Sequence, residues 1–162
     1  MFNVGDTVLY GCEGVCKISE ITEKTFGDTK IEYYILEPVF NNRSTFFVPT
    51  KNETLISKMH PILSDGEITD IINGLGETLD WIDDDNERKD SFREIVSGGD
   101  IREIASMLKC IMIHKEEVED LGKRLHKSDE IISKEAQKVL YEEFALVIDG
   151  ITKDDVMKMI MK

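Results

Sequence analysis

Polar and apolar residues alternate along much of residues 4–50, which is typical of strands that bury one face. The alternation is clear around Val8, and residues 31–36 are rich in β-branched and aromatic side chains. Turn-forming residues interrupt the pattern at a spacing of about ten residues. The pattern therefore predicts about four or five short strands in a small β-barrel or a strongly bent sheet.

The period changes after Pro61, where apolar residues recur every three or four positions, as on one face of a helix. Residues that can cap a first turn mark the starts of about five helices, and glycines mark several ends. The first predicted helix begins after Ser64 and ends at Gly74 and Gly76, and the second covers residues 84–96. The third begins after Asp100, the fourth begins at residues 128–130 and ends at Gly150, and the fifth begins after Thr152.

These two patterns predict an α+β fold in two parts. Residues 1–60 are expected to form the small β domain. Residues 61–162 are expected to form an all-α domain, in which residues 61–83 are an acidic connection and helix. A β domain of this size has little core of its own, so we expect it to be only marginally stable unless it docks on its neighbour.

Composition limits the partners of the chain. The 162 residues include 20 Lys and Arg and 33 Asp and Glu, a net charge of −13, and 41% are hydrophobic. The apolar content suffices for a core, and the charge excludes a strongly basic nucleic-acid binder. The excess acid is local, because residues 61–87 carry a net −9 while residues 88–162 carry only −2. A basic face in the second half is therefore compatible with the overall charge.

Signals for export and membrane insertion were not found. The sequence has no apolar run of about 18 residues and no secretory signal near its N-terminus. Three cysteines cannot all pair within one chain, so free thiols are the simpler interpretation. We expect a cytoplasmic protein without membrane contact.

Residues for catalysis or metal binding are sparse. Cys12 and Cys16 lack the further ligands of a structural zinc site, and the three histidines are scattered. The run Asp83–Asp85 is either a solvated acidic segment or a weak Mg²⁺ site, and the first is favoured because hard-cation sites draw acids from several segments. We expect no catalytic residue, no metal, no cofactor and no small-molecule substrate, and therefore not an enzyme.

Two aromatic features have two interpretations each. Trp81, the only Trp, either anchors the acidic connection on the helices or is an exposed contact residue. Phe46 and Phe47 lie on opposite faces of one predicted strand, so one faces the core. The other is either covered by the helical part or exposed to a partner, for example by pairing of this strand with another sheet.

Several short motifs occur together in an order that is typical of one family. They are Val4–Tyr10, Gly14-Val15, Glu32–Leu36, Val48-Pro49, a lone Trp followed by Ser97–Asp100, and Glu143–Leu146. Through them nearly the whole chain resembles the CarD/CdnL family of bacterial RNA polymerase-binding transcription regulators.

The resemblance implies a fold and a function. In this family a Tudor-like β-barrel binds a lobe of the RNA polymerase β subunit, and the helical domain lies on promoter DNA at the upstream edge of the bubble. A Trp enters the minor groove there and stabilises the open complex without sequence-specific readout. Polymerase binding would fall to Lys24, Thr45, Phe46 and Phe47, and the minor-groove contact to Trp81. Slightly later in the chain, Arg88, Lys89 and Arg93 are expected to supply DNA phosphate contacts from the next helix. The protein would be nucleoid-associated through the polymerase.

The sequence departs from the family pattern beside the Trp. Acids at Asp83–Asp85 follow Trp81 where basic residues are common in the family, so DNA binding is expected to be weak and salt-sensitive. Phe47 also replaces a residue that is often basic. The alternative function is an acidic interaction module that binds a basic protein through residues 61–87 and makes no DNA contact.

Overall fold

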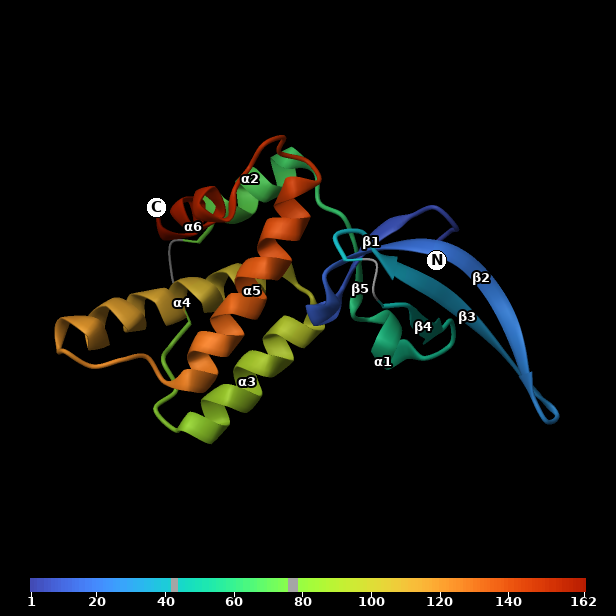
Figure 1. The fold of residues 1–162 in the computed structure, drawn as a ribbon, viewed down its shortest axis with the longest axis horizontal. Coiled ribbons are helices and arrows are strands. Elements are labelled where there is room, and N and C mark those ends of the chain that lie inside the picture. The colour runs from blue at the N-terminus through green and yellow to red at the C-terminus, as the bar shows by residue number, and fades with distance from the viewer. Residues whose placement is uncertain (42–43, 76–78) are drawn as a thin grey trace.

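The computed structural model describes residues 1–41, 44–75 and 79–162. It confirms the α+β fold, with a Tudor-like β module followed by helices (Figure 1). The strands of the described residues are β1 (Thr7–Tyr10), β2 (Val15–Phe26), β3 (Thr29–Pro38), β4 (Phe46–Pro49) and β5 (Met59–Pro61).

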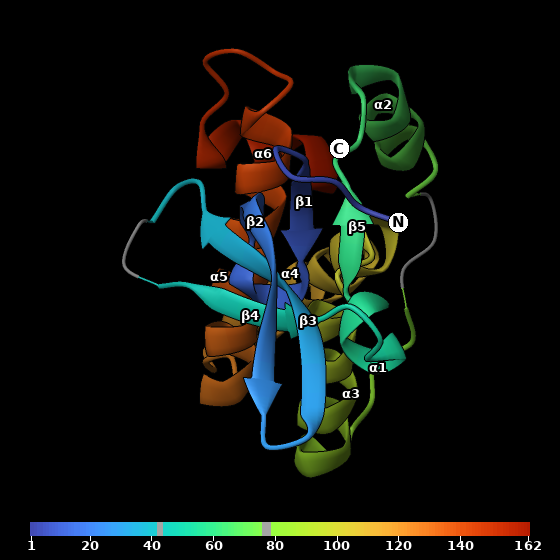
Figure 2. The same cartoon turned by 90° about the vertical axis from the view of Figure 1, so that its right-hand side faces the viewer.

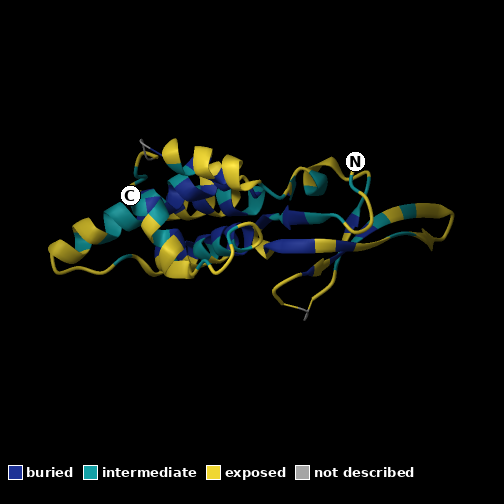
Figure 3. Ribbon diagram, turned by 90° about the horizontal axis from the view of Figure 1, so that it is seen from above, coloured by how far each residue is buried: buried dark blue, intermediate teal, exposed yellow. Residues whose placement is uncertain are grey.

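The strands form one antiparallel sheet in the order β4-β3-β2-β1-β5, which leaves β4 at one end. Strands β2 and β3 form a long hairpin that projects from the rest of the molecule (Figures 1 and 2). Pairing of β2 with β3 continues to Phe26 opposite Thr29. Alternation is weak in the outer hairpin because most of its residues are exposed on both faces, so no buried stripe marks it (Figure 3).

The helices of the described residues are α1 (Glu53–Ile56), α2 (Asp65–Asn73), α3 (Asp85–Gly98), α4 (Ile101–Asp120), α5 (Lys127–Ala145) and α6 (Lys153–Met161). The last five confirm the predicted helices, although α5 begins at Lys127 after a His126 cap and ends at Ala145, five residues before the predicted end at Gly150. Gly76, which was also predicted to end α2, lies outside the described residues. The Ser64 side chain accepts a hydrogen bond from the Glu67 N–H in a capping box, and Thr152 does the same in α6. The pattern did not predict α1 and β5, which are too short to show a period.

The apolar interior has two clusters. One lies within the β module, and the other lies among the helices and includes Leu9 and Val15 from the β module. Buried residues gather where the helices meet the base of the sheet (Figure 3). The division at residue 60 remains a prediction, because side chains from both sides of it share the helical cluster. No helix in the described part of the chain is long and apolar enough to cross a membrane.

Two neighbouring carboxylates on α5 join the two clusters. Glu143 Oε1 accepts a hydrogen bond from the Leu63 N–H at 2.7 Å, just beyond β5. Glu142 lies against Gly14 in the turn before β2, where a Cβ would collide with its carboxylate and φ is +88°. Both carboxylates are buried, and within the described residues the Oε2 atom of each lacks a hydrogen-bond partner. Adjacent residues of α5 thus contact the turn before β2 and the segment just after β5.

Burial makes the charged form of both groups unfavourable. It raises the pKa of Glu142, although Lys138 opposes this effect. It raises the pKa of Glu143 to about 7, and the nearby charge of Glu67 acts in the same direction. A protonated Glu143 therefore fits this junction better than a charged one.

We expect Glu143→Gln to flatten the pH dependence of stability. The folded state binds more protons than the unfolded state between the two pKa values, so this contribution is complete below pH 4.5 and is lost as pH rises through about 7. The whole shift corresponds to on the order of 3 kcal/mol. Urea unfolding between pH 4.5 and 8 measures it. The exposed Glu130→Gln is the control, and an unchanged slope in Glu143→Gln would contradict the assignment.

Candidate functional site

An exposed group of side chains lies on the outer face of the sheet beside the end strand β4. We call Lys24, Tyr33 and Phe47 the sheet patch. The Lys24 Nζ atom lies 4.4 Å from the centroid of the Phe47 ring, and Tyr33 meets that ring edge-to-face at 6.2 Å between centroids. Phe47 remains 46% exposed, so the helical part does not cover it. The structure thus joins two residues, Lys24 and Phe47, that were predicted to contact the polymerase.

The neighbouring residues of β4 have different positions. Phe46 points to the inner face and packs on Tyr10 at 6.0 Å between ring centroids, within the cluster of the β module. This position does not fit a direct partner contact. Thr45 is exposed just before the strand. Sequence reasoning missed Phe26, which is 56% exposed at the end of β2 and shares the face of Lys24 by strand alternation. The feature of the sequence that could have identified Phe26 is its place directly before the Gly27-Asp28 turn, where an apolar residue is unusual.

A second group of side chains surrounds Trp81. Its indole is half-buried and packs against the helical cluster, as the anchor interpretation predicts. The His114 imidazole stacks on it, with ring centroids 3.6 Å apart and planes 12° apart. Phe92 contacts it edge-to-face at 6.0 Å. The indole is thus held by both α3 and α4 while part of it remains accessible.

Arg88 is buried beneath this group, with only 2% of its surface exposed. Its Nε and Nη2 atoms donate to the two carboxylate oxygens of Asp129 at 2.9 and 2.8 Å. It also donates to Asp85 and to the Ile82 carbonyl, and its guanidinium lies 4.5 Å from the Trp81 ring centroid. Arg88 was predicted to contact DNA. That contact does not fit its position, because the guanidinium donates its hydrogen bonds to groups within the fold.

Exposed cations lie around this buried group. Lys89 and Arg93, two of the predicted DNA contacts, are exposed and lie four residues apart on α3. We call Lys123, Arg124 and Lys127 the basic loop. All three are exposed. Residues 121–128 contain no acid, and this feature of the sequence could have identified the basic loop.

The basic loop lies close to the start of α3, and therefore close to Arg88, which lies against the Trp81 ring. His126, within this segment, approaches Asp85 to 3.7 Å, and Asp129 at the start of α5 binds Arg88. The basic loop therefore lies near the start of α3, where Arg88 contacts the indole.

The acidic run after Trp81 has a structural role. Asp84 caps α3 by accepting a hydrogen bond from the Glu87 N–H at 2.8 Å. The hydrogen bond from Arg88 lowers the pKa of Asp85, and the charge of His126 acts in the same direction. Among the described residues, no group of three or more His, Cys, Asp or Glu side chains is arranged to hold a metal ion.

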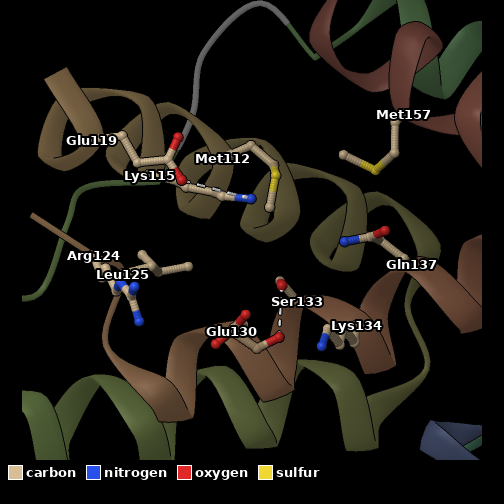
Figure 4. A pocket seen from close by; sticks show the side chains of 10 residues that line it. All are labelled: Met112, Lys115, Glu119, Arg124, Leu125, Glu130, Ser133, Lys134, Gln137 and Met157. Atoms are coloured by element: carbon tan, nitrogen blue, oxygen red, sulfur yellow. Dashed lines mark hydrogen bonds and ion pairs between the residues drawn. The ribbon is translucent and has the colours of Figure 1, made fainter.

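A groove of about 610 Å³ lies between α4, α5 and α6. Lys115, Arg124 and Lys134 line it together with two acids, and its apolar floor includes Met112 and Met157 (Figure 4). Lys115 pairs with Glu119 at 4.0 Å, so part of this charge is compensated. Through Arg124 the groove adjoins the basic loop.

Comparisons with known proteins agree with this arrangement. The family model of the CarD-like/TRCF RID domain matches residues 2–60, which contain the sheet patch. The chain is also 28% identical to the Bacillus subtilis (strain 168) protein "Putative transcription factor YdeB" over 161 residues, or 96% of this chain and 97% of that protein. Residues 2–60 thus match the CarD-like/TRCF RID domain, and the chain as a whole is similar to a protein named as a transcription factor. Together the two matches indicate a transcription factor of the CarD type.

We expect Arg88→Ala to destabilise this CarD-like protein. The substitution leaves the Asp129 carboxylate buried without its partner, which typically costs about 3–5 kcal/mol of unfolding free energy. Lys89→Ala, at the exposed neighbouring position, is expected to change it by less than about 0.5 kcal/mol. Chemical denaturation followed by circular dichroism measures both. Equal effects of the two substitutions would show that the buried pair does not support the fold.

Proposed function

We propose that this CarD-like protein is a non-enzymatic regulator that bridges RNA polymerase and promoter DNA. Its β module, residues 1–60, binds the lobe of the polymerase β subunit. Its helical domain, residues 61–162, contacts the upstream edge of the bubble and stabilises the open complex. The observation that carries this proposal is the exposed sheet patch beside an end strand, within the segment that matches the CarD-like domain.

The polymerase contact is supported by the chemistry of the sheet patch. An end strand offers unpaired backbone groups to a strand of a partner, and β4 occupies such a position. Phe47 and Phe26 supply exposed apolar area, while Lys24 supplies a charge that suits an acidic partner surface. Thr45 precedes the strand and is accessible, whereas Phe46 supports Phe47 from the inner face.

The DNA contact is supported by an accessible aromatic ring with cations nearby. Part of Trp81 is exposed, and an aromatic wedge gains contact where base pairs are already distorted. Lys89, Arg93 and the basic loop are proposed to contact phosphates, which orient a protein on DNA without reading its sequence. Binding to DNA alone is expected to be weak because the chain carries a net −13.

The two proposed contacts complement each other. Attachment to the polymerase raises the effective concentration of the helical domain at the promoter, so a weak DNA contact suffices. The proposal places the protein in the cytoplasm, where it is nucleoid-associated through the polymerase, and it requires no cofactor. Which promoters respond depends on the kinetic step that limits each of them.

One observation favours the alternative function. Every described acid of residues 61–87 is exposed, so this segment could bind a basic protein without DNA contact. A photocrosslinker at position 81 in a polymerase–promoter complex separates the two functions. Crosslinks to upstream DNA support the bridging function, and crosslinks to protein alone support the alternative.

We expect Phe47→Ala to weaken polymerase binding by about tenfold or more, as for an aromatic hot spot. The side chain is exposed, so the melting temperature should change little. Interferometry with immobilised polymerase measures the affinity. Ile131→Ala, which removes a similarly exposed apolar side chain from α5, is the matched control and should bind normally. Unchanged affinity of Phe47→Ala would remove the sheet patch from the proposed interface.

We expect Trp81→Ala to shorten the lifetime of the open complex while polymerase affinity is retained. The lost wedge no longer opposes rewinding, and the sheet patch is unaffected. Decay after addition of a competitor measures the lifetime, and Trp81→Phe, which keeps a ring, should retain part of the effect. Circular dichroism verifies that both variants are folded. A normal lifetime in folded Trp81→Ala would exclude the wedge.

A further inference from the structure

The Trp81 indole has one parallel neighbour that fixes the plane of its ring. The His114 imidazole lies 3.6 Å away by ring centroids, and the two planes differ by 12°. Phe92 touches the indole only edge-to-face, with an interplanar angle of 67°. A parallel stack is lost when the indole rotates about its side-chain bonds, whereas an edge contact tolerates some rotation. His114 is therefore the aromatic contact that favours one orientation, and the Arg88 guanidinium lies 4.5 Å from the centroid of the same ring.

Helix α4 also holds the chain next to Trp81. Cys110, one turn before His114, donates a hydrogen bond from Sγ to the Leu79 carbonyl at 3.2 Å. The segment before the indole and the indole itself are thus attached to the same face of α4. Because α4 carries both attachments, the orientation of the ring follows from this helix and not from the connection alone.

His114 is accessible to protons, because 28% of its side chain is exposed. Charges surround it from four elements. Glu117 on α4 approaches its Nδ1 atom to 3.8 Å, and Arg88 on α3 lies against the indole. Asp80 in the connection and Asp129 on α5 both act on the neighbouring Cys110.

We propose that His114 is a positioning residue, which holds the indole of Trp81 in the orientation that meets DNA and holds it more firmly when protonated. An imidazolium over an indole gains a cation–π attraction that a neutral imidazole lacks. Glu117 compensates the added charge. The functional part of this inference rests on the proposed DNA contact, whereas the control of the indole by His114 does not.

Fluorescence tests the control of the indole directly, because Trp81 is the only Trp in the chain. A stacked imidazolium quenches indole emission, so emission of the wild type should rise in one step when His114 loses its proton. His114→Phe keeps a flat ring without a proton and should abolish the step. His126→Asn, which retains a capping side chain on α5, should keep it. A step that persists in His114→Phe would overturn the inference.

Order of the indole is the second measurement. The near-ultraviolet circular dichroism of Trp81 should diminish in His114→Ala and be restored in His114→Phe. Far-ultraviolet spectra establish that both variants are folded. An undiminished signal in folded His114→Ala would overturn the positioning role.

The lifetime of the open complex connects this role to function. His114→Ala should shorten it by about two- to tenfold, the factor that corresponds to one lost aromatic pair, and His114→Phe should restore it. A shortened lifetime with unchanged Trp81 spectra would overturn the positioning role. If Trp81→Ala itself leaves the lifetime normal, the proposed function fails, and the spectra still decide whether His114 controls the ring.

Discussion

The buried guanidinium of Arg88 is the constraint on which the helical part depends. It binds both carboxylate oxygens of Asp129 on α5, the Ile82 carbonyl in the connection, and Asp85 at the start of α3. A buried ion pair adds little net stability compared with apolar packing, because both charges lose their hydration. Its geometry is nevertheless specific, since a planar fork fits a carboxylate in few arrangements. The pair thus fixes where the connection crosses the helices, and with it the site of Trp81.

The proposed contacts lie at opposite ends of the molecule. The β2–β3 hairpin projects at one end, and the connection between α4 and α5 lies at the other (Figure 1). Attachment of one end positions the other only if the junction between them is stiff. Glu142 and Glu143 provide such a junction, because adjacent positions of α5 reach the turn before β2 and the segment after β5. Leu9 and Val15 add apolar contacts from the β module to the helical cluster. The junction therefore combines packing with hydrogen bonds to groups that are costly to expose or misplace.

Helices and strands with a periodic apolar pattern or a capping residue could be predicted from the sequence. Elements that have neither feature could not. Helix α2 was predicted with its capping box because Ser64 and Glu67 are local signals. Placement of Phe46 and Phe47 on opposite faces followed from alternation, but alternation cannot say which face is covered. The contact between Lys24 and Phe47 depends on the order of three strands, which the pattern did not specify. Tertiary pairing likewise explains the role of Arg88. A basic residue at the start of a helix suggests a surface charge, and only the position of Asp129, 41 residues later, makes it a buried group.

The acids beside Trp81 also acquire a physical explanation from this pairing. Asp84 caps α3, and Asp85 accepts a hydrogen bond from Arg88 and lies near His126. The acids that follow the indole therefore interact with a backbone N–H group and with basic side chains of the fold. Their negative charge still acts at a distance, but it falls off over about 8–10 Å at physiological salt. Residues 121–128 contain no acid, so the exposed cations of the basic loop lie in a segment without negative charge. Under the proposed function, this local surface contacts phosphate although the whole protein is acidic. The proposal treats its attraction for DNA as small, and it therefore requires a partner that brings it to the promoter, for which the sheet patch at the other end of the molecule is suited.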